Sequence, residues 1–285
     1  EFRRVLFRSD SVLLGSGVEM ETGNYFEVYE FPSGLNAANG LSIDENDNVW
    51  IVDTTSSFFF KFDPITKEFT KFITSTPQKS AYGNATGIIK SPISRPYWSE
   101  TDMNGNLFFN EQTSNQIAVY DIKNSYLVEY MVPSKNPNWA DCNTESSSDC
   151  GVAQIFGFDA IDNQIWFTEW AENKIGVVDT KKPLPFSVST DKNSLTLKNG
   201  ESQTITLNVD SSSNTGKINF NSAHTASTAT ASSDIQISHT MINPNEILVT
   251  VTANPIAIAG DYKLLLGVYN SEVNVSKFID ITIEP

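Results

Sequence analysis

Three carboxylates recur at a constant interval along the chain. Asp53, Glu111 and Glu169 each end a short apolar run, and each lies 58 residues after the one before. Carboxylate oxygens are the ligands that Mg²⁺ and Ca²⁺ prefer, so one interpretation is a divalent cation site shared by the repeats. The other is that each carboxylate caps neighbouring strand ends. The wide separation expected between adjacent repeats favours capping.

A second set of residues has the chemistry of a binding surface. Aromatic rings and arginine are enriched where proteins recognise their partners. The chain places such side chains at or beside the predicted loops at one end of its repeats: Arg95, Tyr97, Trp98, Trp139 and Trp170. They predict recognition of a peptide, a glycan or another small molecule.

Cys142 and Cys150 are the only cysteines, and their spacing suits a small loop closed by a disulfide. A disulfide indicates an oxidising compartment, and therefore a secreted or cell-surface protein. The alternative is a pair of reduced thiols in a cytoplasmic loop. Two cysteines do not make a tetrahedral zinc site, and no histidine precedes His224.

The elements that must position these residues are short strands. Apolar alternation separated by Asp/Asn-rich turns predicts four antiparallel strands in the first repeat, near 40–43, 49–53, 58–63 and 69–74. The second repeat is the same pattern shifted by one period. Four strands per repeat are typical of a β-propeller blade, and the extra residues near 75–93 and 134–152 predict long loops around one mouth of the channel.

The ends of the repeat array indicate an incomplete propeller. Residues 25–32 match a fourth strand, and the third repeat stops at Asp179 after its third strand. The region 10–180 thus predicts about three and a half blades, where a closed ring has roughly four to eight. Residues 1–9 resemble a translated sequencing adapter, with a basic targeting peptide as the alternative.

The C-terminal part has a different pattern. Residues 181–185 read as a Pro/Lys linker, and 186–285 contain seven short alternating strands. This number of strands in about 100 residues predicts an immunoglobulin-like β-sandwich. The fold class is therefore all-β.

Composition narrows the classes of partner. The chain has 19 basic and 34 acidic residues, a net charge of −15 and a pI near 4.5, which argues against a nucleic-acid or anionic-membrane partner. No apolar run approaches the roughly 18 residues needed to span a bilayer. We expect a monomer.

The third repeat carries a family resemblance. Its segment Ile-Trp-Phe-Thr-Glu-Trp-Ala-Glu-Asn-Lys-Ile-Gly, residues 165–176, is similar to the blade motif of virginiamycin B lyases (streptogramin lyases), and a weaker match extends over about 17–180. The resemblance implies a seven-bladed propeller. It also implies a lyase that opens a cyclic depsipeptide by elimination, with a histidine base and Mg²⁺.

In that family the base stands at the start of an innermost strand. Asn39, Tyr97 and Phe156 occupy the corresponding positions, and none is a histidine. An unperturbed tyrosine, with a pKa of about 10, is largely protonated at neutral pH. The sequence therefore favours a binding module with the sandwich as a spacer. The alternatives are a lyase or lactonase-like enzyme with its catalytic residues on further blades, and a structural protein of the cell envelope.

Overall fold

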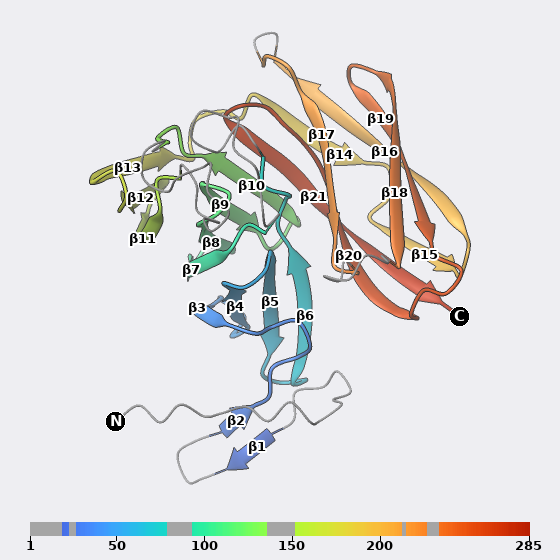
Figure 1. Ribbon diagram of the computed structural model, residues 1–285, viewed down its shortest axis with the longest axis horizontal. Helices are drawn as coiled ribbons and strands as arrows, with labels where there is room; N and C mark the ends of the chain where they lie inside the picture. Colours follow the sequence, from blue (N-terminus) through green and yellow to red (C-terminus); the bar gives the residue numbers. More distant parts are fainter. Residues whose placement is uncertain (1–18, 23–26, 79–92, 136–151, 213–214, 227–233) are drawn as a thin grey trace, which may run out of the picture.

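The protein is an all-β molecule. The computed structural model describes residues 19–22, 27–78, 93–135, 152–212, 215–226 and 234–285. Strands make up 61% of the structure, the described residues contain no helix, and none of the antiparallel sheets closes on itself. Figure 1 shows small sheets at the N-terminal side and a larger pair of sheets formed by the C-terminal third.

The first repeat folds as a four-stranded antiparallel meander, here called the first meander. Its strands follow one another in the order β3 (Ala38–Ile43), β4 (Val49–Asp53), β5 (Phe58–Asp63) and β6 (Glu68–Ile73). These bounds agree with the predicted strands to within two residues. Asp44 explains the tight turn, because its Oδ1 accepts hydrogen bonds from the backbone N–H groups of Asn46 and Asn48.

Two more meanders follow the first at the predicted interval. A hairpin of β1 (Glu19–Thr22) and β2 (Glu27–Tyr29) precedes the first meander. The second meander contains β7 (Pro96–Thr101), β8 (Asn106–Glu111), β9 (Gln116–Asp121) and β10 (Tyr126–Met131). The third meander contains β11 (Ile155–Ile161), β12 (Gln164–Glu169) and β13 (Lys174–Asp179). The predicted long loops lie mostly outside the described residues.

Aromatic side chains fill the space between the first and second meanders. Trp50 and Phe59 of the first meander contact Tyr120 of the second, with ring centroids 5.7 and 5.6 Å apart. Phe59 also lies 5.1 Å from Phe109. All four rings are buried. Offset and edge-to-face ring pairs of this kind add to the free energy gained by burial alone.

The C-terminal unit, residues 186–285, consists of two sheets around one apolar core. One sheet has the order β14 (Phe186–Thr190), β16 (Ser202–Ser211), β19 (Glu246–Ala253) and β18 (Ile235–Asn243). The other contains β17 (Asn219–His224), β20 (Gly260–Tyr269), β21 (Val273–Glu284) and β15 (Ser194–Lys198), the last parallel to β21. Strand β17 was missed from sequence because its run Asn-Phe-Asn-Ser-Ala-His does not alternate between apolar and polar residues.

A continuous sheet joins the C-terminal unit to the second meander. Strand β10 pairs antiparallel with β21, from Tyr126 opposite Lys277 to Tyr130 opposite Val273. Figure 1 shows the two strands side by side. Leu265 and Phe278 of the C-terminal unit also enter the aromatic core between the first two meanders. The C-terminal unit therefore packs against the meanders through both a shared sheet and a shared apolar core.

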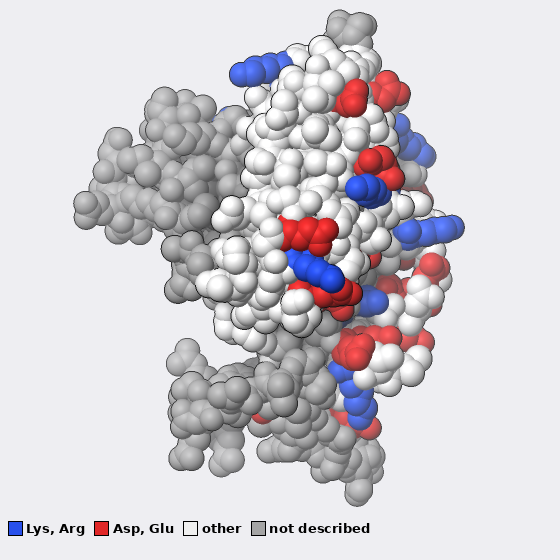
Figure 2. All heavy atoms as spheres, turned by 90° about the vertical axis from the view of Figure 1, so that its right-hand side faces the viewer, with Lys and Arg blue, Asp and Glu red and all other residues white. Residues whose placement is uncertain are grey.

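The exposed face of the C-terminal unit carries few charges. In Figure 2 most of this face is uncharged, and its acidic and basic side chains are interspersed. The low charge of this face follows from the alternation of apolar and polar residues along its strands. Strand β16, for example, points buried Ile205, Leu207 and Val209 inward and small polar side chains outward. No helix among the described residues is long and apolar enough to cross a membrane.

Candidate ligand-binding surface

Three aromatic side chains from the second and third meanders form a chain of ring contacts. Tyr97 of β7 packs edge-to-face on Phe156 of β11, with centroids 5.5 Å apart. Phe156 packs in the same way on Trp170, at 5.4 Å. Phe156 is 38% and Trp170 60% exposed, although large apolar side chains usually lie inside. We call Tyr97, Phe156 and Trp170 the aromatic surface.

A repeated backbone device positions this surface. Arg95 and Gln154 precede β7 and β11 with φ values of 55° and 57°, in the left-handed region that non-glycine residues rarely adopt. Each carbonyl accepts a hydrogen bond from the residue after the second strand, Arg95 from Gln112 N–H (3.1 Å) and Gln154 from Trp170 N–H (3.0 Å). The latter bond places Trp170 beside the start of β11.

Polar contacts hold β7 and β11 at a fixed separation. The side chain of Asn110 accepts a hydrogen bond from Trp98 N–H (2.7 Å) and donates one to the carbonyl of Ile155 (2.6 Å). Glu100 Oε2 accepts a bond from Ala160 N–H at 3.0 Å. Both bridges connect the two meanders, so they hold Tyr97 on β7 beside Phe156 on β11.

The predicted binding residues divide into three groups. Tyr97 and Trp170 come together through Phe156. Trp98 is 45% exposed, while Arg95 is half-buried and donates from Nε to the carbonyl of Thr54 (3.3 Å), which ties the second meander to the first. Trp139 lies outside the described residues, as do Cys142 and Cys150 with their predicted disulfide.

Sequence reasoning did not assign a binding role to Phe156. It considered this position only as the place where the resembling family has its base. The signal that could have identified Phe156 is the alignment of the three repeats at the start of their first strands. This alignment places Asn39, Tyr97 and Phe156 at matching positions.

The three recurring carboxylates differ in what they bind. Asp53 is fully buried, and its Oδ1 accepts hydrogen bonds from Ala37 N–H (3.0 Å) and from Thr55 N–H (3.1 Å) and hydroxyl (2.9 Å). Its Oδ2 accepts one from the Ser56 hydroxyl at 2.8 Å. Asp53 therefore caps the strand ends, as the capping interpretation predicts.

Glu111 and Glu169 are also buried but are not satisfied in this way. Both carboxylate oxygens of Glu111, and Oε2 of Glu169, have no hydrogen-bond partner. Within the described ranges, no three His, Cys, Asp or Glu side chains gather into a group that could hold a metal ion. The shared cation site considered for these carboxylates therefore does not form among the described residues.

Both histidines lie in the C-terminal unit, in β17 and β18, and not at the first strands of the meanders. Burial lowers the pKa of His224, and the nearby Asp234 partly offsets this effect. His239 packs on the ring of Phe220 at 4.2 Å. At the matching starts of β3 and β7, Asn39 is exposed and Tyr97 is half-buried.

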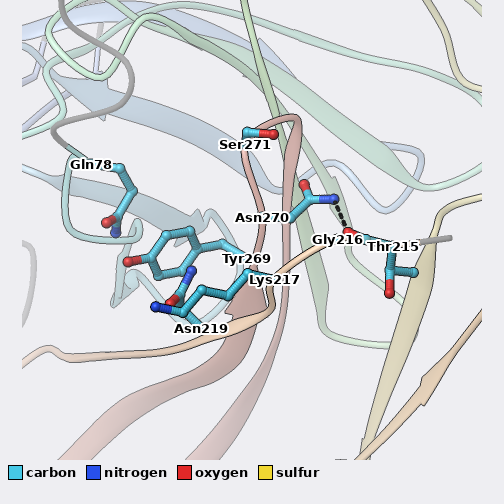
Figure 3. A pocket seen from close by; sticks show the side chains of 8 residues that line it. All are labelled: Gln78, Thr215, Gly216, Lys217, Asn219, Tyr269, Asn270 and Ser271. Atoms are coloured by element: carbon cyan, nitrogen blue, oxygen red, sulfur yellow. Dashed lines mark hydrogen bonds between the residues drawn. The ribbon is translucent and has the colours of Figure 1, made fainter.

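Hollows lie elsewhere on the described surface, including the following two. A polar one of about 520 Å³ is lined by Gln78, Tyr269 and residues near the start of β17, and Asn270 Nδ2 donates to Thr215 O across its edge at 3.1 Å (Figure 3). A cleft of about 610 Å³ between the second meander and the C-terminal unit is lined by Phe108 and Tyr130. Neither hollow includes the aromatic surface.

Comparison with known proteins gives no assignment. No protein-family model matches the chain, and no curated protein matches it in sequence.

Proposed function

We propose that this protein is a binding module that recognises its ligand through the aromatic surface. The observation that carries the proposal is the chain of ring contacts from Tyr97 through Phe156 to Trp170, in which the last two rings are 38% and 60% exposed. Exposed aromatic side chains that pack on one another offer a large contact area at a low cost in conformational entropy.

The chemistry of the surface favours a ligand with flat apolar faces and no negative charge. Trp170 and Phe156 can pack on the face of a sugar ring or on an apolar side chain of a peptide. The acidic Asp159 and Glu169 lie on the same pair of strands, and the whole chain carries −15. A glycan or an apolar peptide therefore fits better than a phosphate or a nucleic acid.

Repeat-equivalent positions support a wider proposal about architecture. We infer that the meanders are blades of the virginiamycin B lyase-like propeller type and that the aromatic surface lies at the channel mouth. The C-terminal unit, with its two sheets around one core, supports an immunoglobulin-like sandwich. Secretion or display at the cell surface follows from the proposed disulfide between Cys142 and Cys150.

The test is a binding titration with a panel of neutral oligosaccharides and apolar peptides, in which tryptophan fluorescence and calorimetry measure the binding. Trp170→Ala is expected to weaken binding of any ligand found by about tenfold or more, because stacking on one aromatic ring is worth roughly 1–3 kcal/mol.

Trp166→Ala is the matched control. Trp166 is 43% exposed on the neighbouring strand β12, but its indole Nε1 donates to Gln164 and its ring is not part of the aromatic surface. Its loss should leave affinity unchanged. Equal losses for the two variants, or a ligand whose affinity neither variant alters, would refute the proposal.

A further inference from the structure

A row of buried polar side chains crosses the sheet that joins the second meander to the C-terminal unit. Glu111 of β8 stands opposite Gln116 of β9, and Glu129 of β10 stands opposite Asn274 of β21. Glu129 and Gln116 lie on the same face, because Glu129 is opposite Ala118, two residues along from Gln116. All four are at most 1% exposed. We call them the buried polar row.

Only half of this row is satisfied by hydrogen bonds. Glu129 Oε1 accepts from Ser75 N–H at 2.9 Å, and its Oε2 accepts from Asn274 Nδ2 at 2.8 Å. Neither oxygen of Glu111 has a partner, and neither does the amide oxygen or nitrogen of Gln116. A buried polar group without a partner costs roughly 1–3 kcal/mol, and more if it is charged. Something must therefore compensate these groups.

The first meander shows what occupies the equivalent place. One period earlier, Asp53 and Lys71 stand where Glu111 and Glu129 stand in the second meander, and Phe58 stands where Gln116 does. The Lys71 ammonium lies 3.7 Å from the centre of the Phe58 ring. Burial lowers the pKa of Lys71, and the Asp53 carboxylate partly offsets this. The first meander thus has a cation on this face, whereas the second has a second carboxyl group.

The two meanders also differ in the side chain that follows the second strand's apolar run, which is Asp53 in the first meander and the longer Glu111 in the second. In the first meander, the turn hydroxyls of Thr55 and Ser56 donate to Asp53. In the second, the buried Thr113 hydroxyl has no partner, and the buried Ser114 hydroxyl lies close to Glu111 without a well-formed hydrogen bond.

Glu111 lies instead beside Glu129, and the two carboxyl groups are close enough to interact, although their geometry falls short of a well-formed hydrogen bond. Burial, followed by the charge of Glu129, raises the pKa of Glu111 well above its usual range. Among the described residues, no salt bridge pairs either carboxyl group with a cation.

We propose that the buried polar row binds a hard cation, with Ca²⁺ as its representative, between the carboxylates of Glu111 and Glu129. The amide oxygen of Gln116 and the hydroxyl of Ser114 are the further protein ligands. An all-oxygen set suits Ca²⁺, and two carboxylates neutralise its charge. This compensation matters because an uncompensated buried charge is strongly destabilising.

The polar hollow in Figure 3 lies near one end of the buried polar row. Tyr269, which lines the hollow, is the cross-strand partner of Asn274 at the end of the row. Gln78, on the other wall, lies shortly after Ser75, whose N–H binds Glu129. The residues that line the hollow are therefore neighbours of the row, and none of the four residues of the row lines it.

The experiment measures Ca²⁺ binding to the full chain by calorimetry after treatment with a chelator, and thermal unfolding with and without Ca²⁺. The wild-type protein is expected to bind one Ca²⁺ and to unfold at a higher temperature when it is present. Glu111→Gln keeps the shape of the side chain and removes its charge, so its Ca²⁺ affinity should fall by about tenfold or more.

Glu169→Gln is the matched control, because Glu169 is the buried carboxylate at the equivalent position of the third meander. It should bind Ca²⁺ as the wild type does. If the wild type neither binds Ca²⁺ nor gains stability from it, the proposal is overturned, and a shared proton with buried water accounts for the row. Unchanged affinity in Glu111→Gln would overturn it equally.

Discussion

One methylene group separates two different roles at equivalent positions. The shorter Asp53 stays within its own turn and accepts four hydrogen bonds there. The longer Glu111 lies beside Glu129 and makes no well-formed hydrogen bond with the hydroxyls of its turn. Side-chain length therefore separates the carboxylate that is a structural cap from the one that belongs to the proposed cation site.

The cap role of Asp53 predicts a large loss of stability on truncation. Asp53→Ala removes a buried acceptor and leaves the donors of Ala37, Thr55 and Ser56 unpaired, so we expect unfolding to become easier by about 2–4 kcal/mol. Denaturant unfolding measures this difference. Asp63→Ala removes an exposed turn carboxylate instead and should cost distinctly less. Similar losses for the two variants would contradict the assignment.

At the scale of the elements, the strand starts position the aromatic surface. Register shifts occur near the start of each first strand, between Ala38 and Leu41 in β3, Pro96 and Ser99 in β7, and Ile155 and Phe158 in β11. Such bulges re-aim side chains without ending the strand. The close approach of β3 to β7 depends on Gly40.

A substitution at Gly40 is expected to move β7. A Cβ atom there would lie 2.6 Å from Ser99 N and 2.8 Å from the carbonyl carbon of Trp98, and these are backbone atoms. Gly40→Ala should therefore destabilise the fold by about 1–3 kcal/mol. Gly157, at the equivalent position of β11, has nothing within 4 Å of such an atom.

Gly157→Ala is the control for this prediction, and its cost should stay within about 0.5 kcal/mol. Thermal and denaturant unfolding of the two variants provide the comparison. A Gly157→Ala variant that is as unstable as Gly40→Ala would show that close packing of β3 on β7 is not the cause.

At the scale of the whole molecule, the C-terminal unit forms part of the core of the repeats. Phe278 contacts Phe59 (6.1 Å), Phe72 (5.3 Å) and Tyr120 (5.5 Å), all in the first two meanders. The sheet formed by β10 and β21 supplies backbone hydrogen bonds at the same junction. We therefore expect the first two meanders and the C-terminal unit to unfold together.

Phe278→Ala tests this coupling. Removing the ring leaves a cavity in the shared core, so the free energy of unfolding should fall by about 3–5 kcal/mol. The near-ultraviolet circular dichroism, to which Trp50 of the same core contributes, should report the change, although Phe278 lies far from Trp50 in the sequence. Ile281→Ala, within the core of the C-terminal unit, is the control whose native state should leave that signal unperturbed. Two separate unfolding transitions in the wild type would contradict the expected coupling.

Much of the local structure could be predicted because it depends on short-range pattern. Apolar alternation and Asp/Asn turns located the strands of the first meander to within two residues, and the constant period located the others. The candidate site could be predicted only in part. Tyr97 and Trp170 were identified by residue type, whereas Phe156 was not, because its contact with both rings depends on how β7 and β11 face each other.

By itself, the sequence determined the all-β class, the period of 58 residues and the positions of most strands, because alternation and turn chemistry act between near neighbours. The tertiary structure alone decided that β10 pairs with β21 and that Glu111 and Glu129 share a buried sheet face. It also decided that Asp53 is saturated with hydrogen bonds. These outcomes depend on which faces of distant segments meet, and that is fixed by burial of the whole apolar surface rather than by any local pattern.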